Sequence, residues 1–110
     1  MPTRFCLLLF VFQVISLGHS PAAEPENPIR MMSYNIRYNT PNDGVNAWPN
    51  RKEHVAEMIG ERYKADLAGL QEALKEQIED LETRLPDYGW FGVGRDDGKE
   101  EGEFCPIFYR

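Results

Sequence analysis

The residues best suited to chemistry are an amide and a carboxylate that each stand at the end of a short apolar segment. Glu72 closes the run from Ala65, directly after Gln71, and Asn35 stands near the end of the segment Ile29 to Ile36. A carboxylate supplies negative charge to a hard divalent cation, and an amide can orient an oxygen nucleophile. The pair therefore suits metal-assisted hydrolysis of a phosphate ester. By its position alone, Glu72 could equally be a solvated glutamate at a strand end.

The two side chains can meet only if their segments are neighbouring parallel strands. The run 65–72 is short and apolar and lies between helix-like segments, so it is predicted to be a strand buried on both faces. The segment 29–36 follows Pro28, and its apolar and aromatic content predicts another strand. Parallel strands keep their polar chemistry at the same rim of a sheet. Adjacency of these strands would bring Asn35 and Glu72 together.

Two helices are predicted between the strands. Asn50 and Glu53 form a capping-box pattern that predicts a helix over 51–63, after a loop at 39–46 that is dense in turn formers. Apolar side chains at helical spacing predict a second helix that begins near Leu74 and stops at Pro86.

The C-terminal part is predicted to hold two more strands, at 88–93 and 103–110, joined by a polar loop at 94–102 with several glycines. The resulting order β-α-β-α-β-β indicates an α/β layered fold with a mixed sheet. The sequence ends on Tyr109 and Arg110, with no turn or polar tail after the last predicted strand, and one sheet face would be poorly covered. We therefore interpret the chain as the front part of a larger domain.

Residues 1–22 have the pattern of a secretory signal peptide. Arg4 provides the positive charge, Phe5 to Leu17 is hydrophobic except for Gln13, and Ser20 to Ala22 offers small residues for cleavage. The hydrophobic stretch is shorter than the roughly 20 residues of a membrane span. Residues 23–28 are interpreted as a linker, and the remaining chain as exported to the periplasm or the cell exterior. An uncleaved membrane anchor is the alternative.

The charge of the chain is acidic. Removal of residues 1–22 takes away Arg4 and no acidic residue, so the net charge changes from −6 to −7. Such a chain has no general electrostatic attraction to nucleic acid. Of the two cysteines only Cys105 would remain, so an internal disulfide is excluded for residues 23–110.

Seven short motifs follow one another along the chain: Met32 to Arg37 (MSYNIR), Asp43-Gly44, Trp48, Asn50 to Lys52 (NRK), Ala65 to Glu72 (ADLAGLQE), Gly92 to Gly98 (GVGRDDG) and Phe104 to Arg110 (FCPIFYR). Each motif alone is weak, and the series as a whole is specific. In this order they resemble the endonuclease/exonuclease/phosphatase family, the metal-dependent phosphoesterases that include the DNase I-like nucleases. The resemblance extends over nearly all of residues 29–110.

This resemblance implies the N-terminal portion of a DNase I-like layered α/β sandwich with mixed sheets, and a Mg²⁺ or Mn²⁺ ion at the sheet rim. By position, Glu72 is similar to the family's metal-ligating glutamate. Asn35 is similar to the asparagine that orients the attacking water or a metal-bound group, and with Glu72 it is a candidate metal ligand. Glu103 is similar to the acid that orients a catalytic histidine in DNase-like members.

Several arginines could bind a phosphate by a bidentate contact. Arg37 and Arg95 are the candidates. Arg51 is better explained by pairing with a nearby acid in the first turn of its helix. Trp48 and Trp90 could stack on a base or a headgroup, but a role in the core or as a loop anchor is the better explanation.

The function that these observations imply is hydrolysis of a phosphate mono- or diester by in-line attack of water, with nucleic acid, sugar phosphate or lipid headgroup as the substrate. No stable protein partner is implied, and a monomer is expected. The family's later motifs, including its terminal Asp-His, have no counterpart in these 110 residues. We therefore expect no measurable hydrolysis by the chain alone. The alternatives are a non-catalytic remnant or binding module of the same fold, and an acidic exported α/β domain with no phosphate function.

Overall fold

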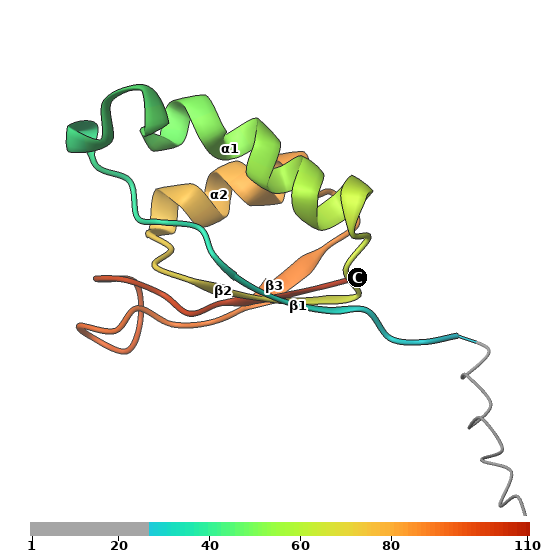
Figure 1. Cartoon of the computed structure of the whole chain (residues 1–110). Coiled ribbons are helices and arrows are strands. Elements are labelled where there is room, and N and C mark those ends of the chain that lie inside the picture. The colour runs from blue at the N-terminus through green and yellow to red at the C-terminus, as the bar shows by residue number, and fades with distance from the viewer. Residues whose placement is uncertain (1–26) are drawn as a thin grey trace, which may run out of the picture.

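The computed structural model describes residues 27–110, which form a four-stranded sheet with two helices on one face (Figure 1). The predicted order β-α-β-α-β-β is confirmed. The predicted signal peptide 1–22 and most of the predicted linker lie outside the described residues. The strands are β1 (Met31–Asn35), β2 (Leu67–Gln71), β3 (Gly89–Phe91) and β4 (Ile107–Tyr109), and the α-helices are α1 (Trp48–Glu57) and α2 (Lys75–Arg84).

The sheet is mixed, with the strand order β1-β2-β4-β3. Strand β1 pairs with β2 in parallel, and Asn35 lies opposite Gln71 at the end of both strands. Strand β4 is antiparallel to β2 and to β3. The parallel pairing that a contact between Asn35 and Glu72 requires is therefore present, and the two strand ends share one rim of the sheet.

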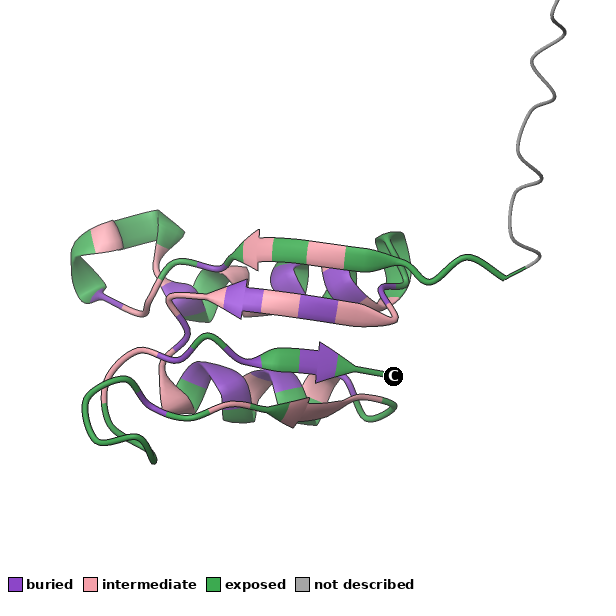
Figure 2. Ribbon diagram, turned by 90° about the horizontal axis from the view of Figure 1, so that it is seen from below, coloured by how far each residue is buried: buried purple, intermediate pink, exposed green. Residues whose placement is uncertain are grey.

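Both helices lie against the same face of the sheet, and the other face is open over the described residues (Figures 1 and 2). In β2, Ala68 and Leu70 are buried, whereas Leu67, Gly69 and Gln71 are partly exposed. The prediction that this strand is buried on both faces is wrong for the described residues, because helices cover only one side. The open face carries the exposed apolar side chains of Met31, Phe91, Ile107 and Tyr109.

The core lies between the helices and the covered sheet face. Trp48 is 1% exposed, and Phe108 at the middle of β4 is 0% exposed. Trp90 on β3 is half-buried, with its ring 6.3 Å from that of Phe104 and 6.5 Å from that of Phe108. Both tryptophans therefore pack in or against the core, as their sequence context favoured.

Helix α1 begins earlier than the capping pattern predicted. Its N-cap residue is Ala47, and Pro49 lies in the first turn. Backbone N–H groups in the first turn have no acceptor within the helix, so a proline, which has no N–H, costs nothing there. Asn50 lies inside the helix, and its side chain donates to the Val45 carbonyl at 3.2 Å. The predicted capping box at Asn50 is therefore wrong.

The ends of other elements also differ from prediction. After Glu57 the helix continues as a π-helical turn, Met58–Arg62, so the predicted 51–63 helix is not a single α-helix. The predicted loop at 39–46 contains a 3-10 helix, Pro41–Asn46, with a kink at Gly44. The last predicted strand is shorter because Pro106, which has no N–H, precedes the ordered pairing of β4. None of the helices in residues 27–110 has the length and apolar character needed to span a bilayer.

Candidate functional site

Asn35 and Glu72 meet at the rim of the sheet where β1 and β2 end. The Asn35 Nδ2 group donates to Glu72 Oε1 at 2.8 Å, although the two residues are 37 positions apart in the chain. The Asn35 side-chain oxygen, Oδ1, accepts the backbone N–H of Arg37 at 2.9 Å. The side-chain NH₂ group of Asn35, rather than its side-chain oxygen, therefore faces the carboxylate. In this arrangement Asn35 orients Glu72.

An irregularity in β2 places Glu72 at the rim. Gly69 pairs with Ile107 and Ala73 with Phe104, so three residues of one chain segment lie opposite two of the other. Such a bulge adds one residue to the strand, so the alternation between buried and exposed side chains shifts by one position. Ala73 takes the buried position that follows Leu70, and Glu72 is left at the edge, with an exposed side-chain fraction of 32%.

The backbone at this rim adopts an uncommon conformation. Glu72 has φ of 58° and Arg37 has φ of 60°, and these are two of the three non-glycine residues with positive φ among residues 27–110. Such a conformation costs a non-glycine residue on the order of 1–2 kcal/mol. Strained backbone that persists tends to cluster at functional sites. Here both strained residues adjoin the Asn35–Glu72 contact.

Arg37 is engaged by acidic partners at this rim. Its guanidinium makes two hydrogen bonds to Asp43, at 3.0 and 3.1 Å, and lies 4.0 Å from Glu72 Oε2. The bond from Arg37 holds the pKa of the Asp43 carboxyl below its usual range. The guanidinium also lies over the Tyr38 ring, 4.4 Å from its centroid. To bind a phosphate through two hydrogen bonds, the Arg37 guanidinium would have to release Asp43.

Arg95 and Glu103 form a separate ion-pair group. Arg95 Nη1 lies 3.2 Å from Glu103 Oε2, and Arg95 Nε lies 3.6 Å from Asp96. Phe104 pairs with Ala73, so Glu103 stands near the same rim as Glu72. Its carboxylate nevertheless contacts Arg95 rather than Asn35 or Glu72. The structure thus brings together Asn35, Glu72 and Arg37, and leaves Glu103 with Arg95 as a second group.

Two residues that hold this rim were not predicted as functional. Arg51 donates to the carbonyls of Ile36 at 2.8 Å, Arg37 at 3.3 Å and Asn46, rather than to a nearby acid as its helix position favoured. Gln77 is 0% exposed and bonds to the segments after both strands. A sequence signal for Gln77 existed, since it lies three residues after Leu74 and therefore shares its helix face.

The Glu72 carboxyl is held in its ionised form. The Asn35 bond lowers its pKa most, with further lowering by the Tyr38 backbone N–H at 3.4 Å and by the charge of Arg37. Partial burial and the charge of Asp43 act in the opposite direction without reversing the shift. An ionised carboxylate with unused lone pairs is able to bind a cation.

We expect the protein to lose stability in acid. The pKa values of five carboxyl groups lie below their ordinary values, each through hydrogen bonds or nearby cations: Asp43, Asp66, Glu72, Asp80 and Asp97. Such groups stabilise the fold fully above their unfolded pKa of about 4, and that contribution is lost as pH falls through the folded values. The urea midpoint should therefore fall between about pH 5 and pH 2. Asp66→Asn should lessen the fall, and a midpoint that stays constant over this range would contradict the expectation.

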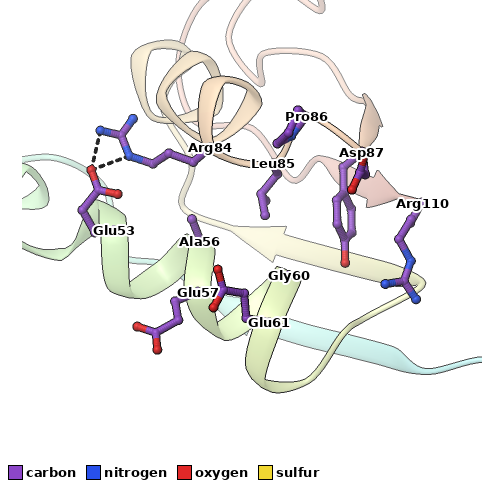
Figure 3. A pocket seen from close by; sticks show the side chains of 11 residues that line it. Glu53, Ala56, Glu57, Gly60, Glu61, Arg84, Leu85, Pro86, Asp87 and Arg110 are labelled. Atoms are coloured by element: carbon purple, nitrogen blue, oxygen red, sulfur yellow. Dashed lines mark hydrogen bonds and ion pairs between the residues drawn. The ribbon is translucent and has the colours of Figure 1, made fainter.

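A groove lies away from this rim, between the two helices and the C-terminal end of the chain, and Figure 3 shows the side chains that line it. It has a volume of about 470 Å³ and is formed by α1, the π-helical turn and the segment around Pro86. Arg84 and Glu53 form an ion pair of 2.7 Å across it. Arg110, which lines the groove, pairs with Asp66 just before β2, whereas Glu72 follows the end of β2. The groove is therefore separate from the Asn35–Glu72 site.

Known structures share the fold of the described residues. An endonuclease/exonuclease/phosphatase from Bacteroides vulgatus is 46% identical, with a TM-score of 0.72 over 74% of this chain and 31% of that chain. These residues have the fold of the N-terminal part of the endonuclease/exonuclease/phosphatase family. Comparisons with protein-family models and with curated proteins found no match.

Two further solved structures match the same fold. A family protein from Bacteroides thetaiotaomicron is 40% identical, with a TM-score of 0.67 over 71% of this chain and 29% of that chain. A mannosyl-6-phosphatase from Bacteroides thetaiotaomicron VPI-5482 is 39% identical, with a TM-score of 0.69 over 73% of this chain and 30% of that chain. The chain thus spans about a third of the length of these neighbours. The predicted DNase I-like α/β fold is confirmed, and the described residues form one mixed sheet of it.

Proposed function

We propose that this chain supplies the Asn35–Glu72 part of a metal-dependent phosphoesterase. The observation that carries the proposal is the 2.8 Å contact between these two side chains at the shared rim of β1 and β2. The phosphoesterase-type fold of its neighbours supports it. In this proposal Glu72 binds the cation, and Asn35 fixes the direction of the carboxylate.

The donor set at the rim suits a hard cation that keeps most of its water. Each Glu72 oxygen has one protein N–H partner, from Asn35 or Tyr38, and a carboxylate oxygen has room for a further interaction. Residues 27–110 contain no group of three or more acidic, histidine or cysteine side chains placed to hold a metal. Mg²⁺ commonly binds through one or two carboxylates plus waters and substrate phosphate. Mg²⁺, with Mn²⁺ as a substitute, is therefore the cation we propose.

The bound cation would polarise a phosphoryl oxygen and stabilise the leaving group. The residues of this chain then have positioning roles. Asn35 and the Tyr38 N–H hold the ionised carboxylate of Glu72, and the Arg37 guanidinium, once released from Asp43, could bind a phosphate oxygen. Arg95 and Glu103 are proposed as a secondary phosphate-binding and orienting pair near the same rim. The one histidine among the described residues, His54, is exposed on α1 and offers no general base beside Glu72.

We propose a sugar phosphomonoester as the first substrate class to test, because one neighbour is a mannosyl-6-phosphatase. The acidic chain, with a net charge of −6, favours a small phosphate ester over nonspecific nucleic acid. Lipid headgroups remain in the proposed set of substrates. Export through the predicted signal peptide and a monomeric state are also parts of this proposal. The competing function is a binding module of the same fold without catalysis.

Magnesium titration tests the proposal directly. We expect Mg²⁺ added to the full chain to shift the NMR signals of Asn35, Tyr38 and Glu72 in a saturable way. Glu72→Ala should abolish the saturation, because it removes the one carboxylate that the amide orients. Glu76→Ala, which removes an exposed acid on the nearby helix α2, should leave it unchanged.

The same preparation, mixed with mannose 6-phosphate and Mg²⁺, should release no measurable phosphate, because no general base faces Glu72 in the described residues. Mg²⁺ shifts that are identical in Glu72→Ala and wild type would rule out the proposed metal site. Phosphate release that depends on Glu72 would show that the chain alone is catalytic and would overturn the expected inactivity.

A further inference from the structure

Helix α2 carries a buried polar side chain that the proposed reaction does not use. Gln77 is 0% exposed, in a face otherwise formed by apolar residues such as Ile78 and Leu81. Its Oε1 accepts the backbone N–H groups of Asn39 at 3.0 Å and Leu74 at 3.1 Å, and its Nε2 donates to the Arg37 carbonyl at 3.0 Å. Buried polar groups are costly unless they are satisfied in this way.

These bonds join the two chain segments that leave the site. Arg37 and Asn39 belong to the segment after β1, and Leu74 belongs to the segment after β2. The Arg37 N–H in turn bonds to Asn35, and Asn35 bonds to Glu72, two residues before Leu74. The contacts therefore close a ring that runs from Gln77 through Arg37, Asn35 and Glu72 and back through the backbone to Leu74.

We propose that Gln77 is a positioning residue that holds the segments after β1 and β2 in register, so that Asn35 and Glu72 stay in contact. Its effect on metal binding rests on the proposed function, but its effect on the Asn35–Glu72 contact does not.

The strained backbone explains why such a residue is needed. Arg37 has positive φ, and its carbonyl is held by Gln77 at 3.0 Å, with Arg51 as a longer second donor at 3.3 Å. A strained conformation persists only where its surroundings over-determine it. Without the Gln77 amide, the Arg37 backbone can relax toward negative φ, which changes the angle between the peptide units on either side of Arg37 and loosens the bond from its N–H to Asn35.

The test measures the Asn35–Glu72 contact without any metal. In the full chain, the side-chain amide signals of Asn35 are recorded by NMR, and Glu72→Ala provides the reference position for a lost bond. Gln77→Leu should move these signals at least half of the way to the reference. Leu81→Ala, another substitution of a 0% exposed residue on α2, should destabilise the protein but leave the signals within a tenth of that range.

A second variant keeps the test decisive if Gln77→Leu does not fold. Gln77→Glu retains an acceptor for Asn39 and Leu74 but cannot donate to the Arg37 carbonyl. It should therefore give a partial shift of the Asn35 signals in the same direction. Asn35 signals that match wild type in the folded Gln77 variants, or that move equally in Leu81→Ala, would overturn the positioning role.

Magnesium affinity separates this inference from the proposed function. Loss of a group that orients a metal ligand typically costs 10–100-fold in metal affinity. Gln77→Leu, or Gln77→Glu if the first variant does not fold, should weaken Mg²⁺ binding about tenfold relative to Leu81→Ala. If wild type binds no Mg²⁺, the proposed function fails while the metal-free signals still decide the role of Gln77. If wild type binds Mg²⁺ and the Gln77 variants bind it equally well, the role in metal binding is overturned.

Discussion

Phe108→Ala is expected to lower the free energy of unfolding by about 3–5 kcal/mol, the cost of removing a fully buried aromatic side chain and leaving a cavity. Phe108 is 0% exposed and lies on β4, which pairs with both β2 and β3. Its ring also lies 6.5 Å from that of Trp90 in a stacked arrangement. In a domain of this size the loss corresponds to a fall in Tm of more than about 10 °C. Urea and thermal unfolding followed by circular dichroism measure it.

The neighbouring residue provides the control. Ile107 stands on the open face of the same strand and is 48% exposed. Ile107→Ala should therefore cost less than about 1 kcal/mol. A large loss in Ile107→Ala together with a small loss in Phe108→Ala would mean that the helices cover the other face of the sheet.

The sequence was sufficient to predict the elements and their order, for a physical reason. Strand β2 lies in a short apolar run, β1 follows a proline and has apolar and aromatic content, and the helix between them has the spacing of an amphipathic segment, so these signals are readable locally. Their adjacency was the condition on which the meeting of Asn35 and Glu72 depended, and it agrees with the tendency of consecutive strands to be neighbours in a sheet. The meeting of Asn35 and Glu72 at one rim could be predicted on that basis.

The sequence could not predict how the rim is shaped. The usual sequence signal for positive φ or for a bulge is a glycine. Position 72 is a glutamate, so neither its positive φ nor the bulge beside it could be read from the sequence. Burial of β2 on both faces was a wrong prediction since Leu67 and Leu70 are equally apolar, and only tertiary packing distinguishes them. Gln77 was overlooked because a polar residue is counted as solvent-facing unless its partners are known, and two of its three partners, Arg37 and Asn39, lie about 40 positions away.

The start of α1 shows how two local signals can compete. Asn50 and Glu53 match a capping box, but Pro49 fits the first turn of a helix equally well. In the structure α1 begins at Trp48. The buried Trp48 indole donates to Asp80 on α2 at 2.9 Å and fixes α1 against α2. Tertiary contact of the indole decided between two cues of similar local strength.

Loss of the Glu72 carboxylate should have the largest effect on catalysis. The test requires a complete domain, so residues 29–110 would replace the corresponding part, about a third, of the Bacteroides thetaiotaomicron mannosyl-6-phosphatase, which is 39% identical. In this chimera Glu72→Ala should lower kcat/KM for mannose 6-phosphate at least about 10²-fold. Metal-ion catalysis is worth several kcal/mol, and each 1.36 kcal/mol is a factor of ten in rate.

The chimera also ranks the roles of the other residues at the rim. Asn35→Ala should lower kcat/KM by about 10–100-fold, because it frees the carboxylate without removing it. Raising Mg²⁺ should restore part of the activity of Asn35→Ala and none of that of Glu72→Ala, since only the first variant keeps the ligand. Glu76→Ala, at an exposed position of α2, is the matched control and should be as active as the unmodified chimera. Equal activity of Glu72→Ala and Glu76→Ala would exclude Glu72 as the metal ligand.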